Sequence, residues 1–257
     1  MLSLLKIVFT LMILSGALAC HGDSARVAVA SNFIKPMGAL IQEFENQTPH
    51  QIKASYGSSG KLFAQITQGA PFQVFLSADQ QKPSQLIENG LGVKGTQFTY
   101  AQGQLVLAGS GLERIALQPG INNTQALITI LGSPSYNKLA IANPKHAPYG
   151  ISAKALLANI GLWPQIESRL VYGENIAQTY QFAMTGNAQL ALIARSQVNS
   201  TTRQQEISVR SYPAILQDAV LLKSGVSNGA ARAFMSFLKT KNAKEIIKAY
   251  GYHVDRV

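Results

Sequence analysis

Four turns in this sequence carry small, uncharged polar residues at points where a strand is predicted to pass into a helix. They are Ser31-Asn32, Ser58-Ser59-Gly60, Tyr149-Gly150 and Asn175-Ile176. The backbone N–H groups at the start of a helix have no helical acceptor, and the helix dipole makes that end positive. Serine hydroxyls add donors, and glycine allows the backbone to approach a ligand closely. Such turns can bind an anion without a charged side chain.

Each turn taken alone has a simpler explanation. Serine and asparagine before a helix usually act as N-caps, which satisfy the first N–H groups of that same helix. A ligand site follows only if the four turns converge. In a parallel α/β sheet the carboxyl ends of the strands lie at one edge, where ligands bind. The residues therefore indicate an anion site without naming the anion.

Signals for catalysis are weak. The segment Gly57-Ser58-Ser59-Gly60 does not match the G-x-S-x-G turn of serine hydrolases, and Gly60-Lys61 lacks the spacing of a phosphate-binding loop. The four histidines lie far apart, without metal-ligand spacing. We expect His146, in a candidate site loop, to order that loop through a hydrogen bond. The expected protein is a binding protein and not an enzyme, with no cofactor and no direct metal ligands.

Alternating strands and helices must position these turns. Apolar alternation and short apolar runs predict strands at residues 26–30, 51–56, 72–76, 104–108, 138–142, 169–172, 189–194 and 215–222. A helical pattern follows most of these strands, and two further helices close the chain. Repetition of strand and helix in this order favours parallel α/β sheets.

The strand and helix pattern restarts after Tyr100, which divides the chain into two α/β lobes. We expect lobe one to comprise residues 20–102 and 215–257, and lobe two to comprise residues 103–214. Two extended hinge crossings would join the lobes, near residues 100–104 and 211–215. The predicted fold class is α/β, with two lobes, mainly parallel sheets and a ligand cleft between the lobes.

The first 19 residues have the layout of a secretory signal. Lys6 precedes an apolar run at residues 7–14, and small residues lead to the expected cut after Ala19. The run is short for a membrane span. We therefore expect residues 1–19 to be cleaved, which leaves an exported, periplasmic chain. Cys20 follows the cut directly, so a lipid anchor on Cys20 is the alternative to plain cleavage.

The chain of 257 residues has 22 Lys and Arg against 12 Asp and Glu, a net charge of +10. Removing residues 1–19 removes one cation, so the mature chain keeps +9. The cations are scattered, and the dense stretch from Lys239 to Lys248 fits the solvated face of an amphipathic helix. Nucleic-acid binding requires clustered cations and is not expected. Diffuse positive potential instead attracts small anions from a distance.

At these turns the sequence resembles the periplasmic molybdate-binding proteins of bacterial ABC importers. The resemblance rests on six segments in the family's order and spacing, which span nearly all of the mature chain: VAVASNF (27–33), SYGSSGKLFAQI (55–66), GAPFQVFLSAD (69–79), NPKHAPYGISAK (143–154), GENIAQ (173–178) and AYGY (249–252). Single segments mean little, but the set is highly specific. It implies the periplasmic binding protein fold, in which two α/β lobes close on a tetrahedral oxyanion.

The resemblance also implies roles for five residues. Ser31 would bind the oxyanion through its backbone N–H and its hydroxyl, with Asn32 beside it. Ser59 would do the same from the second turn of lobe one. Tyr149 and Ile176 would each donate a backbone N–H from lobe two. Side-chain substitutions at Tyr149 and Ile176 should therefore matter less than substitutions at the serines.

One position departs from the common family pattern. Many members place a tyrosine after the strand at 189–194, and its hydroxyl reaches the anion. Ala194 stands at the aligned position here. A subgroup of the family also lacks this tyrosine and has an asparagine in the first motif, where Asn32 stands. The departure leaves the number of donors open, but not the class of ligand.

The implied function is capture of molybdate and tungstate, with little discrimination between them, and delivery to an ABC permease driven by its ATPase. We expect a monomer. A sulfate- or phosphate-binding protein on the same fold is the alternative, because cavity size cannot be read from a sequence. Two further hypotheses are an exported hydrolase with Ser59 as nucleophile, which no motif supports, and a sensor that delivers no ligand.

Overall fold

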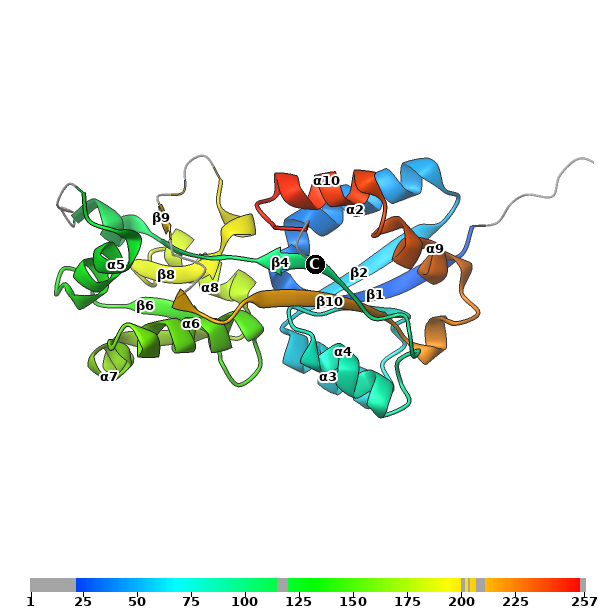
Figure 1. The fold of residues 1–257 in the computed structure, drawn as a ribbon, viewed down its shortest axis with the longest axis horizontal. Coiled ribbons are helices and arrows are strands. Elements are labelled where there is room, and N and C mark those ends of the chain that lie inside the picture. Colours follow the sequence, from blue (N-terminus) through cyan, green and yellow to red (C-terminus); the bar gives the residue numbers. More distant parts are fainter. Residues whose placement is uncertain (1–21, 115–119, 200–201, 203, 207–210, 255–257) are drawn as a thin grey trace, which may run out of the picture.

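The computed structural model describes residues 22–114, 120–199, 202, 204–206 and 211–254. The predicted signal segment and Cys20 lie outside these residues. Within them, no helix combines the length and the apolar character that crossing a membrane requires. The chain forms two α/β lobes that lie side by side, each built on a five-stranded sheet (Figure 1). This confirms the predicted fold class.

The sheet of lobe one has the strand order β2-β1-β3-β10-β4. Its strands are β1 (Ser24–Ala30), β2 (Gln51–Gly57), β3 (Val74–Leu76), β4 (Phe98–Gly103) and β10 (Ile215–Leu221). The central strand β1 is parallel to both β2 and β3, so these three strands end at the same edge. Strand β10 is antiparallel to β3 and β4, and its pairing with β4 is interrupted by a bulge between Gln217 and Asp218.

The sheet of lobe two has the strand order β7-β6-β8-β5-β9. Its strands are β5 (Leu105–Ala108), β6 (Leu139–Ala142), β7 (Leu170–Gly173), β8 (Leu190–Ala194) and β9 (Gln204–Glu206). Here β6 is parallel to its neighbours β7 and β8, and β5 is antiparallel to β8 and β9. In both lobes, the turns from parallel strands into the following helices lie at the carboxyl ends of those strands, at one edge of each sheet.

Helices cover both faces of each sheet. In lobe one, one face carries α2 (Ile34–Gln47), α9 (Gly229–Phe237) and α10 (Lys241–Ala249), and the other carries α3 (Ser59–Thr67) and α4 (Gln81–Glu88). In lobe two, α5 (Asn123–Gly132), α6 (Pro148–Asn159) and α7 (Trp163–Ile166) cover one face, and α8 (Ile176–Met184) covers the other. Strands β3, β5, β6 and β8 are buried along their whole length because helices cover both faces of the sheets.

Short 3₁₀ helices complete the chain where turns tighten: η1 (Ser31–Phe33), η2 (Ser110–Arg114), η3 (Glu167–Arg169), η4 (Arg195–Gln197) and η6 (Lys223–Gly225). Strands β4 and β9 were not expected from the sequence. The stretch at β4 (FTYAQG) lacks a clear apolar alternation, and β9 is three polar residues long. The sequence predicts that Ser77-Ala78-Asp79 begins the helix after the strand at residues 72–76, but this helix, α4, begins at Gln81.

The chain passes between the two sheets at two places. Strand β4 ends at Gly103, and β5 of the other sheet begins at Leu105. The return passes through residues 211–214 into β10. Figure 1 shows β4 and β10 running next to each other along the junction of the lobes. Both crossings therefore adjoin the end of one antiparallel pair, where Ile215 lies opposite Gly103.

Candidate functional site

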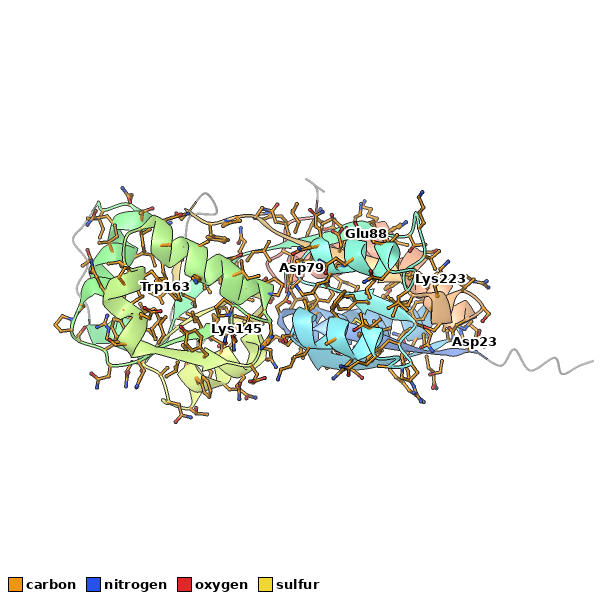
Figure 2. All side chains as sticks on the ribbon, turned by 90° about the horizontal axis from the view of Figure 1, so that it is seen from below. Asp23, Asp79, Glu88, Lys145, Trp163 and Lys223 are labelled. Carbon is orange, nitrogen blue, oxygen red and sulfur yellow. The ribbon has the colours of Figure 1, made fainter. Side chains whose placement is uncertain are left out.

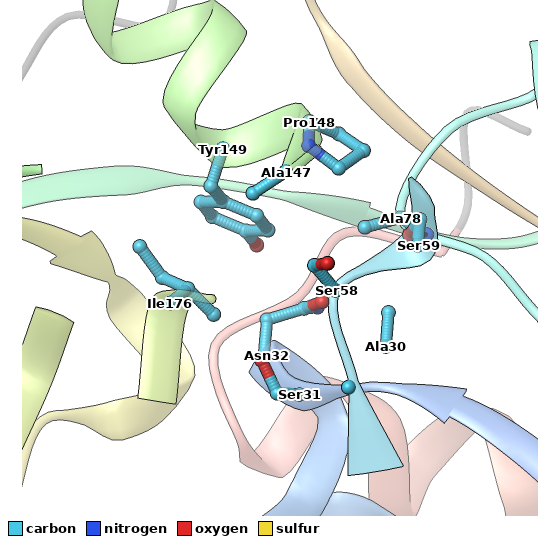
Figure 3. Close-up of a pocket in the computed structure, with 11 residues that line it drawn as sticks. Ala30, Ser31, Asn32, Ser58, Ser59, Ala78, Ala147, Pro148, Tyr149 and Ile176 are labelled. Atoms are coloured by element: carbon cyan, nitrogen blue, oxygen red, sulfur yellow. Dashed lines mark hydrogen bonds between the residues drawn. The ribbon is translucent and has the colours of Figure 1, made fainter. Parts of the chain in front are cut away.

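A pocket lies where the turns of lobe one meet the helix N-termini of lobe two (Figure 3). All five residues singled out from the sequence line it, namely Ser31, Asn32, Ser59, Tyr149 and Ile176. The other lining residues are Ala30, Gly57, Ser58, Ala78, Ala147 and Pro148. The convergence that single turns could not establish is thus present in the folded chain.

The first turn follows β1 directly. Ala30 ends the strand, and Ser31 begins η1, which continues into α2. Neither of these helices has a side-chain cap, so the N–H groups of Ser31 and Asn32 lie at an uncapped helix start. Ser31 is 5% exposed and Asn32 is 2% exposed. The turn presents buried donors to the pocket.

The second turn opens α3 after β2. Ser58 caps the helix, because its Oγ accepts from the backbone N–H of Lys61 at 3.4 Å. Ser59 Oγ accepts from the backbone N–H of Ala78 at 2.9 Å. A hydroxyl that accepts in this way keeps its own proton for donation. Ser59 therefore lines the pocket with an oxygen held in place by Ala78, and its O–H can still donate.

The lobe-two turns are the starts of α6 and α8. Pro148 occupies the first turn of α6, where its missing N–H costs nothing, and Tyr149 follows it. Gly150 lies so close to β6 that a Cβ there would stand 2.2 Å from the carbonyl oxygen of Ala142. Only glycine allows this helix start to approach the strand.

Asn175 caps α8, and its Oδ1 accepts from the backbone N–H groups of Ala177 and Gln178 at 2.9 and 3.0 Å. The cap leaves Ile176, the first helical residue, with an N–H that has no acceptor within the helix. That N–H belongs to a residue that lines the pocket. Asn175 thus acts as an N-cap, which is the usual role of an asparagine before a helix. The backbone N–H of Ile176 remains available to bind a ligand.

No charged residue lines the pocket. The described cations are spread over both lobes, and Figure 2 shows Lys145 in lobe two and Lys223 in lobe one, far from each other. The positive ends of α2, α3, α6 and α8 provide the local electrostatics. An anion held here would be bound by neutral hydrogen-bond donors.

Lobe-to-lobe contacts surround the pocket. The backbone N–H of Gly60 donates to the carbonyl oxygen of His146 at 2.9 Å, and a Cβ at Gly60 would lie 2.8 Å from that oxygen. Lys61 forms an ion pair with Glu174, and Lys35 Nζ donates to the carbonyl oxygen of Gln197 at 2.9 Å. The lobes are therefore in contact in this structure. His146 contributes to the loop through its backbone.

The segment after β8 shows what the chain does without a tyrosine at position 194. Ala194 is fully buried, and its N–H donates to Gln197 Oε1 at 2.9 Å. Gln197 Nε2 donates to the carbonyl oxygen of Ile176 at 2.9 Å. Gln197 thereby fixes the Ile176 turn against β8. No local sequence pattern indicates this role, because the contact joins residues 21 positions apart.

Behind the pocket, Asn32 is held by side chains that the sequence did not single out. Its Nδ2 donates to Gln217 Oε1 at 2.7 Å and to Tyr252 Oη at 2.8 Å. Both amide protons are therefore engaged, and the backbone N–H is the donor that Asn32 retains for a ligand. Tyr252 belongs to the AYGY segment, so the resemblance marked its position without indicating its contact.

Three buried tyrosines belong to this region. Burial raises the pKa of Tyr252 from the usual value of 10 to about 12, although hydrogen bonds from Ser196 and Asn32 oppose the rise. Burial, with neighbouring tyrosines and carboxylates, raises the pKa of Tyr100 well above 10, and burial with neighbouring tyrosines does the same for Tyr149. All three hydroxyls are neutral donors or acceptors at physiological pH.

We expect a loss of stability in alkaline solution. The folded state holds the Tyr252 proton more tightly than the unfolded chain, so this stability is present below pH 10 and is lost as pH rises towards 12. Ultraviolet titration of tyrosinate, followed together with circular dichroism, should show the last tyrosines ionising only as the fold is lost. Ionisation of every tyrosine near pH 10 with the fold retained would contradict this expectation.

The comparisons with known proteins agree with this geometry. The model of a family described as bacterial extracellular solute-binding protein matches residues 25–253. The chain belongs to this family. The predicted resemblance to its molybdate-binding members is also confirmed. The chain is 42% identical over 245 residues to the molybdate-binding protein ModA of Azotobacter vinelandii, covering 93% of this chain and 94% of the relative. It is 40% identical to ModA of Rhodobacter capsulatus, covering 94% and 92%.

Among solved structures, the periplasmic molybdate-binding protein of Azotobacter vinelandii superimposes with a TM-score of 0.80 and 33% identity, covering 89% of this chain and 98% of that one. The sulfate-binding protein SubI of Mycobacterium tuberculosis shares the fold, with a TM-score of 0.73 at 13% identity. Extracellular solute-binding proteins bind ligands and do not convert them. Membership in the family confirms that this protein is not an enzyme and that it needs no cofactor.

Proposed function

We propose that this protein binds molybdate, and tungstate equally, outside the cytoplasm and delivers it to an ABC import permease. One observation carries the proposal: helix starts from two lobes meet in a buried pocket that has several neutral donors and no charged lining residue. The relatives named for molybdate binding support the choice of ligand. The alternative ligands, sulfate and phosphate, are not favoured by these relatives.

The proposed donors come from both lobes. Ser31 and Ser59 each contribute a backbone N–H and a hydroxyl, and Asn32 contributes its backbone N–H. Tyr149 and Ile176 contribute one backbone N–H each. Hydrogen bonds to a charged group stabilise by roughly 1.5–3 kcal/mol each, so a set of this size offsets the cost of removing a dianion from water.

Neutral donors favour a fully ionised oxyanion. Hydrogen phosphate carries a proton that needs an acceptor, and no carboxylate lines the pocket. Sulfate has the charge of molybdate and no proton, so its rejection depends on its smaller size. Molybdate and tungstate have the same charge and nearly the same size, so donors of this kind do not separate them.

We propose that the lobes open and close about the crossings near residues 100–104 and 211–215, with lobe one formed by residues 20–102 and 215–257. Closure would bring the Tyr149 and Ile176 turns onto an anion first held by lobe one. The permease and its ATPase would then receive the closed form. Residues 1–19 serve in this proposal as a cleaved export signal, and the mature protein works as a periplasmic monomer.

Two measurements test the ligand. The protein purified from the periplasm should contain molybdenum or tungsten by elemental analysis. In a thermal-shift panel of molybdate, tungstate, sulfate and phosphate, the first two should stabilise it strongly, because a ligand that binds only the folded state raises the unfolding midpoint. Stabilisation by sulfate alone would overturn the choice of ligand and leave an oxyanion-binding protein of another specificity.

A further inference from the structure

A cluster of buried polar side chains lies directly behind the pocket. It consists of Asn32, Tyr100, Tyr149, Ser196, Gln217 and Tyr252, each at most 5% exposed. They come from six separate parts of the chain and from both lobes. Apolar packing would serve stability at least as well at such a place. A fully bonded polar cluster instead fixes the mutual orientation of its members.

Gln217 is the centre of this cluster and is fully buried. Its Oε1 accepts from Asn32 Nδ2 at 2.7 Å and from Tyr100 Oη at 3.2 Å. Its Nε2 donates to Tyr149 Oη at 3.3 Å. One amide therefore contacts a pocket residue of lobe one with one end and a pocket residue of lobe two with the other.

The backbone around Gln217 is shaped for this contact. Gln217 lies on β10, at the bulge where the pairing with β4 shifts register. Bulges change the direction in which a side chain points, and they are common next to functional sites. Because β10 runs along the junction between the lobes, a side chain aimed from the bulge can reach both of them (Figure 1).

The facing strand leaves room for the contact. Gly103 ends β4 opposite Ile215. A Cβ at Gly103 would lie 2.1 Å from Tyr149 Oη and 2.7 Å from Gln217 Nε2. Neither distance is compatible with a methyl group, so the hydrogen bond between Tyr149 and Gln217 requires glycine here. Gly103 does not line the pocket.

A second connection reaches Asn32 from its other side. The backbone carbonyl of Asn32 accepts from Ser196 Oγ at 2.8 Å and from Tyr252 Oη at 2.9 Å. Ser196 belongs to lobe two, and Tyr252 follows α10 of lobe one. The Asn32 turn is thus held through its side chain by Gln217 and through its backbone by a residue of the opposite lobe.

We propose that Gln217, with the space left by Gly103, is a positioning element of the oxyanion pocket that couples the Asn32 turn of lobe one to the Tyr149 turn of lobe two. It touches no anion itself. It holds the two turns at the separation that lets their N–H groups bind one ligand together. This inference rests on the proposed function, since it assumes a small oxyanion in the pocket.

The test compares Gln217→Met and Gly103→Ala with matched controls, using calorimetry and stopped-flow kinetics with molybdate and with sulfate. Methionine keeps the size of the side chain and removes its hydrogen bonds. The controls are Gln65→Met, on the exposed face of α3, and Gly38→Ala, where an added Cβ has nothing within 4 Å. Circular dichroism and unfolding of each variant without anion measure stability separately from affinity.

Both test variants should bind the anion at least about fivefold more weakly than the wild type, with most of the change in the dissociation rate. The controls should match the wild type. Tyr149→Phe keeps the backbone N–H at this position and removes the hydroxyl that accepts from Gln217 Nε2, so it should weaken binding to a similar extent. If these substitutions only destabilise the fold, the folded variants should instead keep the affinity of the wild type.

Folded test variants with wild-type affinity would overturn the inference, even if they unfold more easily. Should Gln217→Met fail to fold, Gly103→Ala and Tyr149→Phe decide the question. If the wild type binds sulfate and not molybdate, the proposed ligand is wrong, and the sulfate titrations decide the inference. The two failures are therefore distinguishable.

Discussion

Replacing Ile176 with proline is expected to weaken molybdate binding by about 10- to 100-fold and to leave the fold intact. Ile176 is the first residue of α8, where the fixed backbone angle of proline is tolerated. The preceding residue, Asn175, has φ −152° and ψ 174°, an extended conformation that proline accepts in its neighbour. The substitution therefore removes one N–H with little disturbance of the backbone, and it shortens a buried side chain.

The expected loss follows from the charge of the ligand. A hydrogen bond to a charged group contributes roughly 1.5–3 kcal/mol, and each 1.4 kcal/mol is tenfold in affinity. The carbonyl oxygen of Ile176, which accepts from Gln197, is present in proline as well. The variant thus keeps the contact that fixes this turn against β8.

Ile176→Ala is the matched control, because it removes more of the buried side chain than proline does and keeps the N–H. Its affinity for molybdate, measured by calorimetry, should stay within a few-fold of the wild type. Equal losses in the alanine and proline variants would mean that packing of the side chain, and not the backbone donor, determines binding at this position.

The parts of the site that could be predicted from the sequence are local. Ser58 caps α3, and Ser31, Ser59, Tyr149 and Ile176 each lie within two residues of a helix start. Strand, turn and helix lie within a few residues of one another in the sequence. The common edge of parallel strands then brings separate turns together. The identity of the ligand was inferred from the six segments that resemble the molybdate-binding family, since no single turn could indicate it.

The parts that could not be predicted depend on distant contacts. The bonds from Asn32 to Gln217 and Tyr252 join residues 185 and 220 positions apart. The ion pair between Lys61 and Glu174 spans 113 positions and forms only when the lobes meet. No local sequence pattern marks Gln217 in β10 as part of the site, because its contacts depend on a bulge and on the facing Gly103.

The positive charge of the chain is not placed to contact a ligand in the pocket. With a net charge of +10 in the whole chain and no charged residue lining the pocket, we expect the cations to act at a distance. They should raise the rate at which anions arrive, and salt should screen this effect. In the proposed closed form, recognition depends on neutral donors that salt screens little.

Ser59→Ala is expected to reduce both affinity for molybdate and stability. The variant loses the hydroxyl that is proposed to donate to the anion, which should weaken binding by about 10- to 100-fold. It also loses the acceptor for the backbone N–H of Ala78, a bond of 2.9 Å between buried groups. An unpaired buried N–H costs about 1–3 kcal/mol in the free energy of unfolding.

Thr240→Ala separates these two effects. Thr240 caps α10 by accepting from the N–H of Ala243, and it does not line the pocket. Losing this cap costs about 1 kcal/mol. Denaturant unfolding should therefore show a loss of stability in both variants, whereas calorimetry should show weaker binding for Ser59→Ala and wild-type affinity for Thr240→Ala.

Ser31→Ala adds a second comparison from the other lobe-one turn. It should lose at least about tenfold in affinity, since its hydroxyl is a proposed donor to the same anion. If both serine variants bind molybdate as the wild type does, the hydroxyls are not ligands, and the pocket binds through backbone N–H groups alone. In that case Ile176→Pro should retain its full effect, so the three variants together distinguish side-chain from backbone recognition.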